Sequence, residues 1–167
     1  MKPRCRTRCE DMLRQTAESF PELYSPGMRA IARIFRLRDL IFENAQREMA
    51  RFDLSPAEYS VLSVLRKTPP PHALRPSDIT KGMLLTSGGL TKVLKTLEDR
   101  GFIEREDDPD DKRGNLARLT PAGIAFSEQV MHAVVGGDVA MLERVADAQA
   151  VEALANALQP FTEALDR

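Results

Sequence analysis

Apolar residues recur every three or four positions along most of the chain, and this spacing predicts a protein built mainly from α-helices. The longest such stretch runs from Met28 to about Phe52 and predicts an amphipathic helix roughly 34 Å long at about 1.5 Å per residue. Residues 1–28 contain three prolines and one glycine, so we expect them to form an N-terminal extension with a short helix over about 9–19.

Later helices are expected to begin at capping signals. Residues 55–58 (SPAE) combine an N-cap serine, a proline at the first helical position and the glutamate of a capping box. Thr120-Pro121 repeats the cap and the proline before a long apolar segment, in which Gly136-Gly137 is expected to interrupt or bend the helix. Asp147 is expected to cap a last helix with one apolar face.

Three short helices and a hairpin are expected in the middle of the chain. The proline-rich segment 68–73 ends the first helix. Ser77 is expected to cap the second, and Thr86 or Ser87 to open the third, which stops at Gly101.

Beyond that glycine the apolar period changes from helical to alternating. Short strands are expected at 102–106 and 115–119, separated by an acidic turn at 107–114. Helix, helix, helix and hairpin in this order predict a winged helix-turn-helix over 54–120, in a mainly α protein with a small β-hairpin.

This order of elements suits double-stranded DNA. The major groove is about 12 Å wide and admits one α-helix, and the second helix of the motif presents residues near its N-terminus. Gly88 and Gly89 would each cost about 1 kcal/mol inside that helix, which a close approach of the backbone to DNA would justify. The expected DNA-binding residues are Ser77, Thr86, Ser87, Gly88, Thr91, Lys92, Lys95, Arg105, Asp111, Lys112 and Arg113.

The hairpin tip carries a second signal. Arg113 on a protruding loop can enter the narrow minor groove, where the potential is most negative. Asp111 can hold Arg105 or Arg113 in place by a charge-assisted hydrogen bond. The alternative for this stretch is a solvated run of charges.

Charge is unevenly distributed. The net charge is −1, yet residues 1–14 carry five Lys or Arg against two acids, and 29–51 carry six against three. Residues 119–167 carry two basic and seven acidic side chains. Positive charge is therefore concentrated away from the C-terminus, as a surface that faces phosphate requires.

Four stretches resemble the MarR (multiple antibiotic resistance regulator) family, and the resemblance covers about 30–165. They are LSPAEYSVLSVL at 54–65, LRPSDI at 74–79, LTSGGLTKVLKTLEDRGFIERE at 85–106 and DPDDKRGNLARLTPAG at 108–123. The resemblance implies a homodimer that binds a pseudo-palindromic operator, usually represses genes, and is released by a small ligand or an oxidant. It also implies dimerisation helices over 29–53 and 121–167, with the DNA-binding domain between them and the extension over 1–28 outside the resemblance.

A phenolic or anionic organic effector is expected from the same resemblance, with Arg33, Tyr59 and His72 as candidate ligand residues. Two alternatives stay open. Cys5 and Cys9, beside several arginines, would suit a thiol-based redox sensor. A winged helix can also serve as a protein-interaction module.

Other classes of protein are not expected. The longest apolar runs are too short for a membrane span, and no secretory signal is recognisable, so we expect a cytoplasmic protein. The chain has no glycine-rich phosphate loop, no nucleophile-elbow motif and no metal-ligand spacing. We therefore expect no enzyme, no cofactor, no catalytic residue and no metal site.

We expect Arg113→Ala to weaken DNA binding while leaving the dimer and its melting temperature largely unchanged. The reason is its place at the tip of the wing, where the side chain would pack against nothing. A gel shift on the operator and a thermal melt measure the two effects, and an unchanged operator affinity would contradict the wing assignment.

Overall fold

The computed structural model describes residues 8–82, 89–108 and 111–166, with only the backbone described for Gly82 and for 111–114. The chain divides into two compact units, Met1–Glu43 and Asn44–Arg167.

The first unit is a short helical assembly. Helix α1 (Cys9–Ser19) confirms the predicted helix over 9–19, and a 3₁₀ turn, η1 (Pro21–Leu23), follows it. The N-terminal part of α2 (Pro26–Ala50) completes the unit, and this helix begins at a proline, whose fixed φ suits a first turn. Leu13 is the buried residue of α1.

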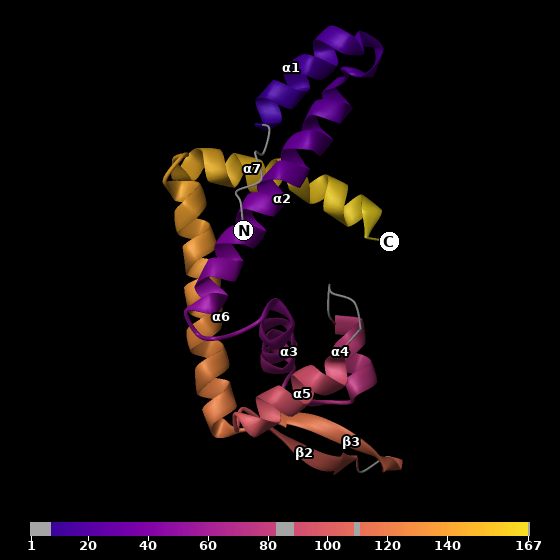
Figure 1. Ribbon diagram of the computed structural model, residues 1–167, viewed down its shortest axis with the longest axis vertical. Helices are drawn as coiled ribbons and strands as arrows, with labels where there is room; N and C mark the ends of the chain where they lie inside the picture. Colours follow the sequence, from indigo (N-terminus) through magenta and orange to yellow (C-terminus); the bar gives the residue numbers. More distant parts are fainter. Residues whose placement is uncertain (1–7, 83–88, 109–110, 167) are drawn as a thin grey trace. The chain divides into compact units, whose positions relative to one another are not determined.

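The second unit is a winged helix-turn-helix with long helices on its C-terminal side, which confirms the predicted fold class (Figure 1). Its helices after α2 are α3 (Pro56–Lys67), α4 (Pro76–Gly82), α5 (Leu90–Asp99), α6 (Pro121–Glu143) and α7 (Ala148–Leu165). Its antiparallel sheet has the order β1-β3-β2, formed by β1 (Ala73–Leu74), β2 (Ile103–Asp108) and β3 (Asp111–Leu119).

Three of the predicted helix caps are confirmed. Ser55 and Glu58 form the full capping box at the start of α3. Thr120 accepts a hydrogen bond from the backbone N–H of Gly123 at 3.0 Å, and Asp147 accepts one from Ala150 at 2.8 Å. Each cap satisfies an N–H that the first helical turn leaves without a partner.

Two of the predicted helix starts are wrong. Helix α4 begins at Pro76, with the N–H groups of Asp78 and Ile79 bonded to the Arg75 carbonyl, so Ser77 lies inside the first turn and is not the cap. Gly89 was expected within the next helix, but it is the N-cap of α5 at φ 93°, a conformation that glycine adopts readily.

Helix α6 runs through Gly136-Gly137 without the predicted interruption. The absence of a side chain at Gly137 is explained by packing. An added Cβ would lie 3.0 Å from Glu48 Cγ on the last turns of α2. On the same side Asn44 Nδ2 donates to Asp138 Oδ1 at 2.9 Å. The missing side chain therefore allows the end of α2 to approach α6 closely.

The hairpin is longer than predicted. Its strands continue into the acidic segment, where Asp107 pairs with Asn115 before the register shifts at Asp108. The two-residue strand β1 was not predicted at all, since two residues carry no period, and it pairs with β3 through Ala73 and Arg118.

The core lies between α3 and the elements that pack on it. Val61, Leu62 and Leu65 of α3 are fully buried, and α3 contacts both α5 and α6. Leu94 and Leu97 supply the buried face of α5. At about 25 cal/mol per Å² of apolar surface, burial of these side chains is the main stabilising term of the unit.

We expect Gly123→Ala to destabilise the protein by about 3 kcal/mol, the upper part of the usual range for overpacking. An added Cβ would lie 1.9 Å from the Phe102 carbonyl oxygen, which is backbone and cannot turn away. Gly136→Ala in the same helix is the matched control, because nothing lies within 4 Å of its added Cβ. Its free energy of unfolding is expected to rise by about 1 kcal/mol. Urea unfolding measures both, and equal stability of the two variants would contradict the proposed contact.

Candidate nucleic-acid interface

Helix α5 has one apolar face and one polar face. Leu94 and Leu97 are buried, whereas Thr91, Lys92 and Lys95 are exposed. Positions 91, 92 and 95 fall on one side of the helix because residues three and four apart are neighbours on its surface. The exposed side therefore offers a hydroxyl and two ammonium groups to a ligand.

Other expected DNA-binding residues lie on neighbouring elements. Ser77 is exposed in the first turn of α4, the helix that precedes α5 in the motif. Arg105 lies on β2, and its Nε is 3.6 Å from Glu98 Oε2, so it links the wing to α5. The predicted candidates Thr86, Ser87 and Gly88 lie outside the described residues, as do the side chains of Asp111, Lys112 and Arg113.

The end of β2 next to the hairpin turn holds an ion pair that the sequence did not predict. Asp108 ends β2 with a side chain only 2% exposed, and Arg75 Nε donates to its Oδ2. Arg75 Nη2 also donates to the other carboxylate oxygen at 3.1 Å. This bidentate pair ties the start of α4 to the point at which the hairpin register shifts.

Each of the three predicted effector residues has its own contacts within the unit to which it belongs. Arg33 on α2 forms a bidentate pair with Glu10 of α1, at 2.9 and 3.0 Å, and this hydrogen-bonded partner holds the pKa of Glu10 below its ordinary value. Tyr59 is half-buried against the core, where burial and then Asp138 raise its pKa. Nδ1 of His72 lies 2.6 Å from the Thr68 carbonyl oxygen.

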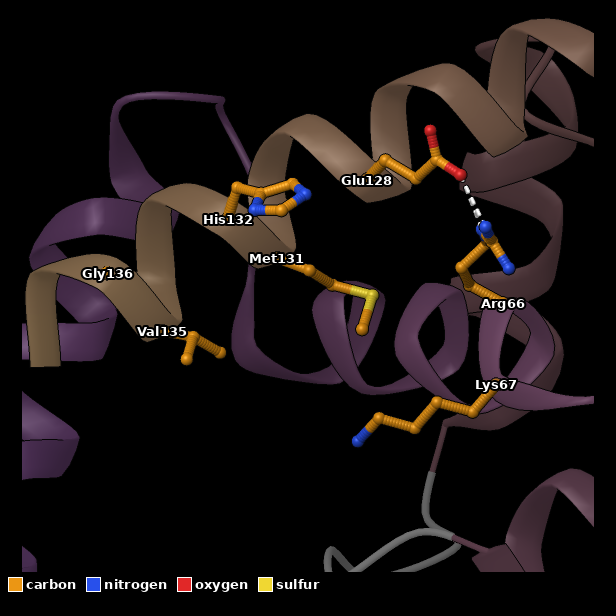
Figure 2. Close-up of a pocket in the computed structure, with 7 residues that line it drawn as sticks. All are labelled: Arg66, Lys67, Glu128, Met131, His132, Val135 and Gly136. Carbon is orange, nitrogen blue, oxygen red and sulfur yellow. Dashed lines mark hydrogen bonds and ion pairs between the residues drawn. The ribbon is translucent and has the colours of Figure 1, made fainter. Parts of the chain in front are cut away.

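The second unit has a larger and a smaller cavity among its described residues, and neither is lined by Tyr59 or His72. The larger cavity, of about 670 Å³, lies between the C-terminal end of α3 and the middle of α6 (Figure 2). It is lined by Arg66, Lys67, Glu128, Met131, His132, Val135 and Gly136. The smaller, of about 420 Å³, is lined by Ala50, Asp53, Leu54, Ser55, Glu58, Thr96 and Arg100.

The larger cavity combines cationic and apolar walls. Arg66 Nε donates to Glu128 Oε1 at 3.0 Å, so the acid of the lining is already paired. Figure 2 shows Met131 directed from α6 into the space before α3, with Lys67 at its edge. Among the described residues neither Lys67 nor His132 has a carboxylate partner. The lining therefore suits a small organic anion with an apolar body.

Cys9 is a free, half-buried thiol at the start of α1, and Cys5 lies outside the described residues. Within the described part of the chain, no three His, Cys, Asp or Glu side chains are grouped as metal ligands would be. None of the described helices combines the length and the apolar character that a membrane span needs.

Comparison with known proteins places these features among transcription regulators. The sequence model of the MarR family matches residues 52–114. Multiple antibiotic resistance protein MarR of Escherichia coli (strain K12) is 30% identical over 127 residues, which cover 76% of this chain and 83% of that protein. MarR of Salmonella typhimurium is 31% identical over 117 residues, 70% of this chain and 76% of that protein.

Solved structures agree with the sequence relatives. Apo MarR from E. coli superposes with a TM-score of 0.68 at 26% identity, covering 77% of this chain and 93% of that one. A mutant MarR from E. coli complexed with operator DNA gives a TM-score of 0.64 at 25% identity, covering 87% and 96%.

Proposed function

The chain belongs to the MarR family of transcription regulators, and on this premise we propose that it is a homodimer that binds a pseudo-palindromic operator in double-stranded DNA. The observation that carries the proposal is the exposed row Thr91, Lys92 and Lys95 on α5, backed by buried leucines. One side of the helix is anchored in the core, and the other offers donors to base edges and phosphates. Helix α5 is accordingly the recognition helix.

Exposed apolar side chains support the homodimer. Ile31, Ile34 and Phe35 share one face of α2, and Phe35 is 61% exposed. Helix α7 has no buried residue, and Phe161 on it is 66% exposed. A monomer rarely leaves several such surfaces in water, and a second copy of the chain would cover them. Two-fold symmetry would then place two recognition helices about 34–36 Å apart, one for each half-site.

We expect Lys92→Ala and Lys95→Ala both to weaken DNA binding, in different ways. We assign Lys92, nearer the start of α5, to base reading together with Thr91. Its loss is expected to cost about 1–3 kcal/mol of binding free energy and to relax the sequence specificity at one position. Lys95, one turn deeper, is assigned to a phosphate, so its loss lowers binding to all sequences and reduces the salt slope by about one. Gel shifts on operator and random DNA at several salt concentrations measure both.

Arg144→Ala is the matched control for the two lysines. It removes one positive charge from an exposed residue at the C-cap of α6, within the acidic C-terminal segment, and should leave binding unchanged. Equal binding by wild type and both lysine variants would refute the recognition-helix assignment and favour a protein-interaction module.

We also propose that the regulator is a repressor released from its operator by a small aromatic or phenolic anion that enters the larger cavity. Its volume of about 670 Å³ lies in the usual range for small-molecule sites. Arg66, Lys67 and His132 would face the anionic group, and Met131 and Val135 the apolar body. A ligand there would lie between α3 of the DNA-binding domain and α6 of the dimerisation region, where it can change how the two pack.

We expect benzoate to raise the melting temperature of the wild type, since a ligand that binds the folded state stabilises it. Lys67→Gln should weaken that binding by about tenfold, as expected for the loss of one charge-assisted hydrogen bond. Benzyl alcohol has the same ring without the charge and serves as the ligand control. Lys81→Gln, an exposed lysine paired with Asp78 at 2.9 Å outside the cavity, is the protein control. Equal shifts for wild type and Lys67→Gln would exclude this cavity as the site.

A further inference from the structure

Arg100 closes the C-terminal end of α5 and contacts the turn that follows α2. Its Nη1 donates to the Asp53 carbonyl oxygen at 2.8 Å, and its Nη2 to the Phe52 carbonyl oxygen at 3.2 Å. Nη1 also lies 3.9 Å from Oε1 of the buried Glu58 in the first turn of α3. The guanidinium therefore contacts two carbonyls of the turn after α2 and a carboxylate at once.

The same guanidinium lies over two aromatic rings. Its central carbon is 5.0 Å from the ring centroid of Phe102, just before β2, and 5.7 Å from that of Phe126 on α6. These two rings stack at 4.1 Å, and Phe126 meets Phe52 edge-on at 6.1 Å. Cation–π attraction adds to the hydrogen bonds, so one side chain connects α5 to the end of α2 and to α6.

Arg100 lies beyond the DNA-facing row of the same helix. It follows Lys95 by five residues and Lys92 by eight, about 8 and 12 Å along the helix axis. Its side chain is 27% exposed, and its donors are occupied by protein groups. Direct contact with DNA is thus not its role.

The geometry of the contacts is directional. A guanidinium has a fixed planar fork of donors, whereas an ammonium group is a compact point charge, so only arginine can address two adjacent carbonyls with one orientation. Apolar packing of the same volume would fill the space without fixing the angle of α5.

We propose that Arg100 is a positioning residue that sets the angle of the recognition helix against the end of α2 and the first turns of α6, and thereby the half-site spacing that the dimer accepts. This inference rests on the proposed DNA-binding function. When both recognition helices are misplaced by the same small angle, the two-fold axis makes them tilt in opposite directions. The distance between the two helices therefore changes.

The test compares wild type, Arg100→Lys and Arg100→Met on duplexes selected from random-sequence DNA by the wild type. Two further duplexes have one base pair inserted or deleted between the half-sites. Arg51→Lys is the matched control, because Arg51 is exposed and pairs with Glu48 at 2.7 Å beside the same turn. Thermal melts and sedimentation of each variant follow its stability and its dimer.

Arg100→Lys is expected to bind the selected duplex about tenfold more weakly, since hydrogen bonds made by a charged group are lost, and to prefer it no longer over the two altered spacings. Arg100→Met should behave in the same way, and Arg51→Lys like the wild type. A purely structural role would lower the melting temperature and weaken binding to all three duplexes in equal proportion.

Retention of the wild-type spacing preference by both Arg100 variants overturns the inference, whatever happens to stability. A wild type that selects no DNA overturns the proposed function itself, and with it this inference. The two failures are therefore told apart by the wild-type protein alone.

Discussion

The close contact between the first turn of α6 and the turn after α5 is the constraint on which the DNA-binding part depends. Thr120 Oγ1 donates to the Gly101 carbonyl at 2.7 Å while it accepts from Gly123, so one hydroxyl ends one helix and starts another. Gly123 allows the backbone of α6 to approach Phe102 so closely that no Cβ fits. The end of α5, the start of the wing and the first turn of α6 consequently meet at one close contact.

The second unit contains a winged domain that buries its own apolar side chains and a helix, α7, that does not. The winged domain covers its own leucines, and Val61 and Leu65 of α3 have no exposed surface. Helix α7 buries no residue, although it is 18 residues long and well capped. Capping and propensity contribute little to an isolated helix compared with packing, so α7 depends on surfaces outside a single chain for most of its stability. The proposed homodimer would supply them.

Local signals made much of the fold predictable from the sequence. Ser55, Thr120 and Asp147 act within four residues of their own position, and a periodic apolar face decided which side of α5 is exposed. The predicted interruption at Gly136-Gly137 is absent because intrinsic propensity is weak against tertiary packing along α6.

What the sequence did not reveal depends on distant partners. Arg100 bonds to carbonyls 47 and 48 residues away, and Arg66 meets Glu128 across 62 residues. No periodic pattern or motif in the sequence marks either pair. The cavity and the contacts that hold the end of α5 could therefore be found only from the three-dimensional structure. The effector residues Arg33, Tyr59 and His72 were inferred from resemblance alone and stay predictions.

The pairing of β1 with β3 has a topological consequence. By joining Ala73 to Arg118 it closes a loop of the chain that contains α4, α5 and β2. The entropy of closing such a loop grows only slowly with its length, so a two-residue strand can hold it shut once the surrounding core has formed. Helix α5 therefore lies in a segment whose two ends are held next to each other, which limits the conformations open to that segment if α5 detaches from the domain.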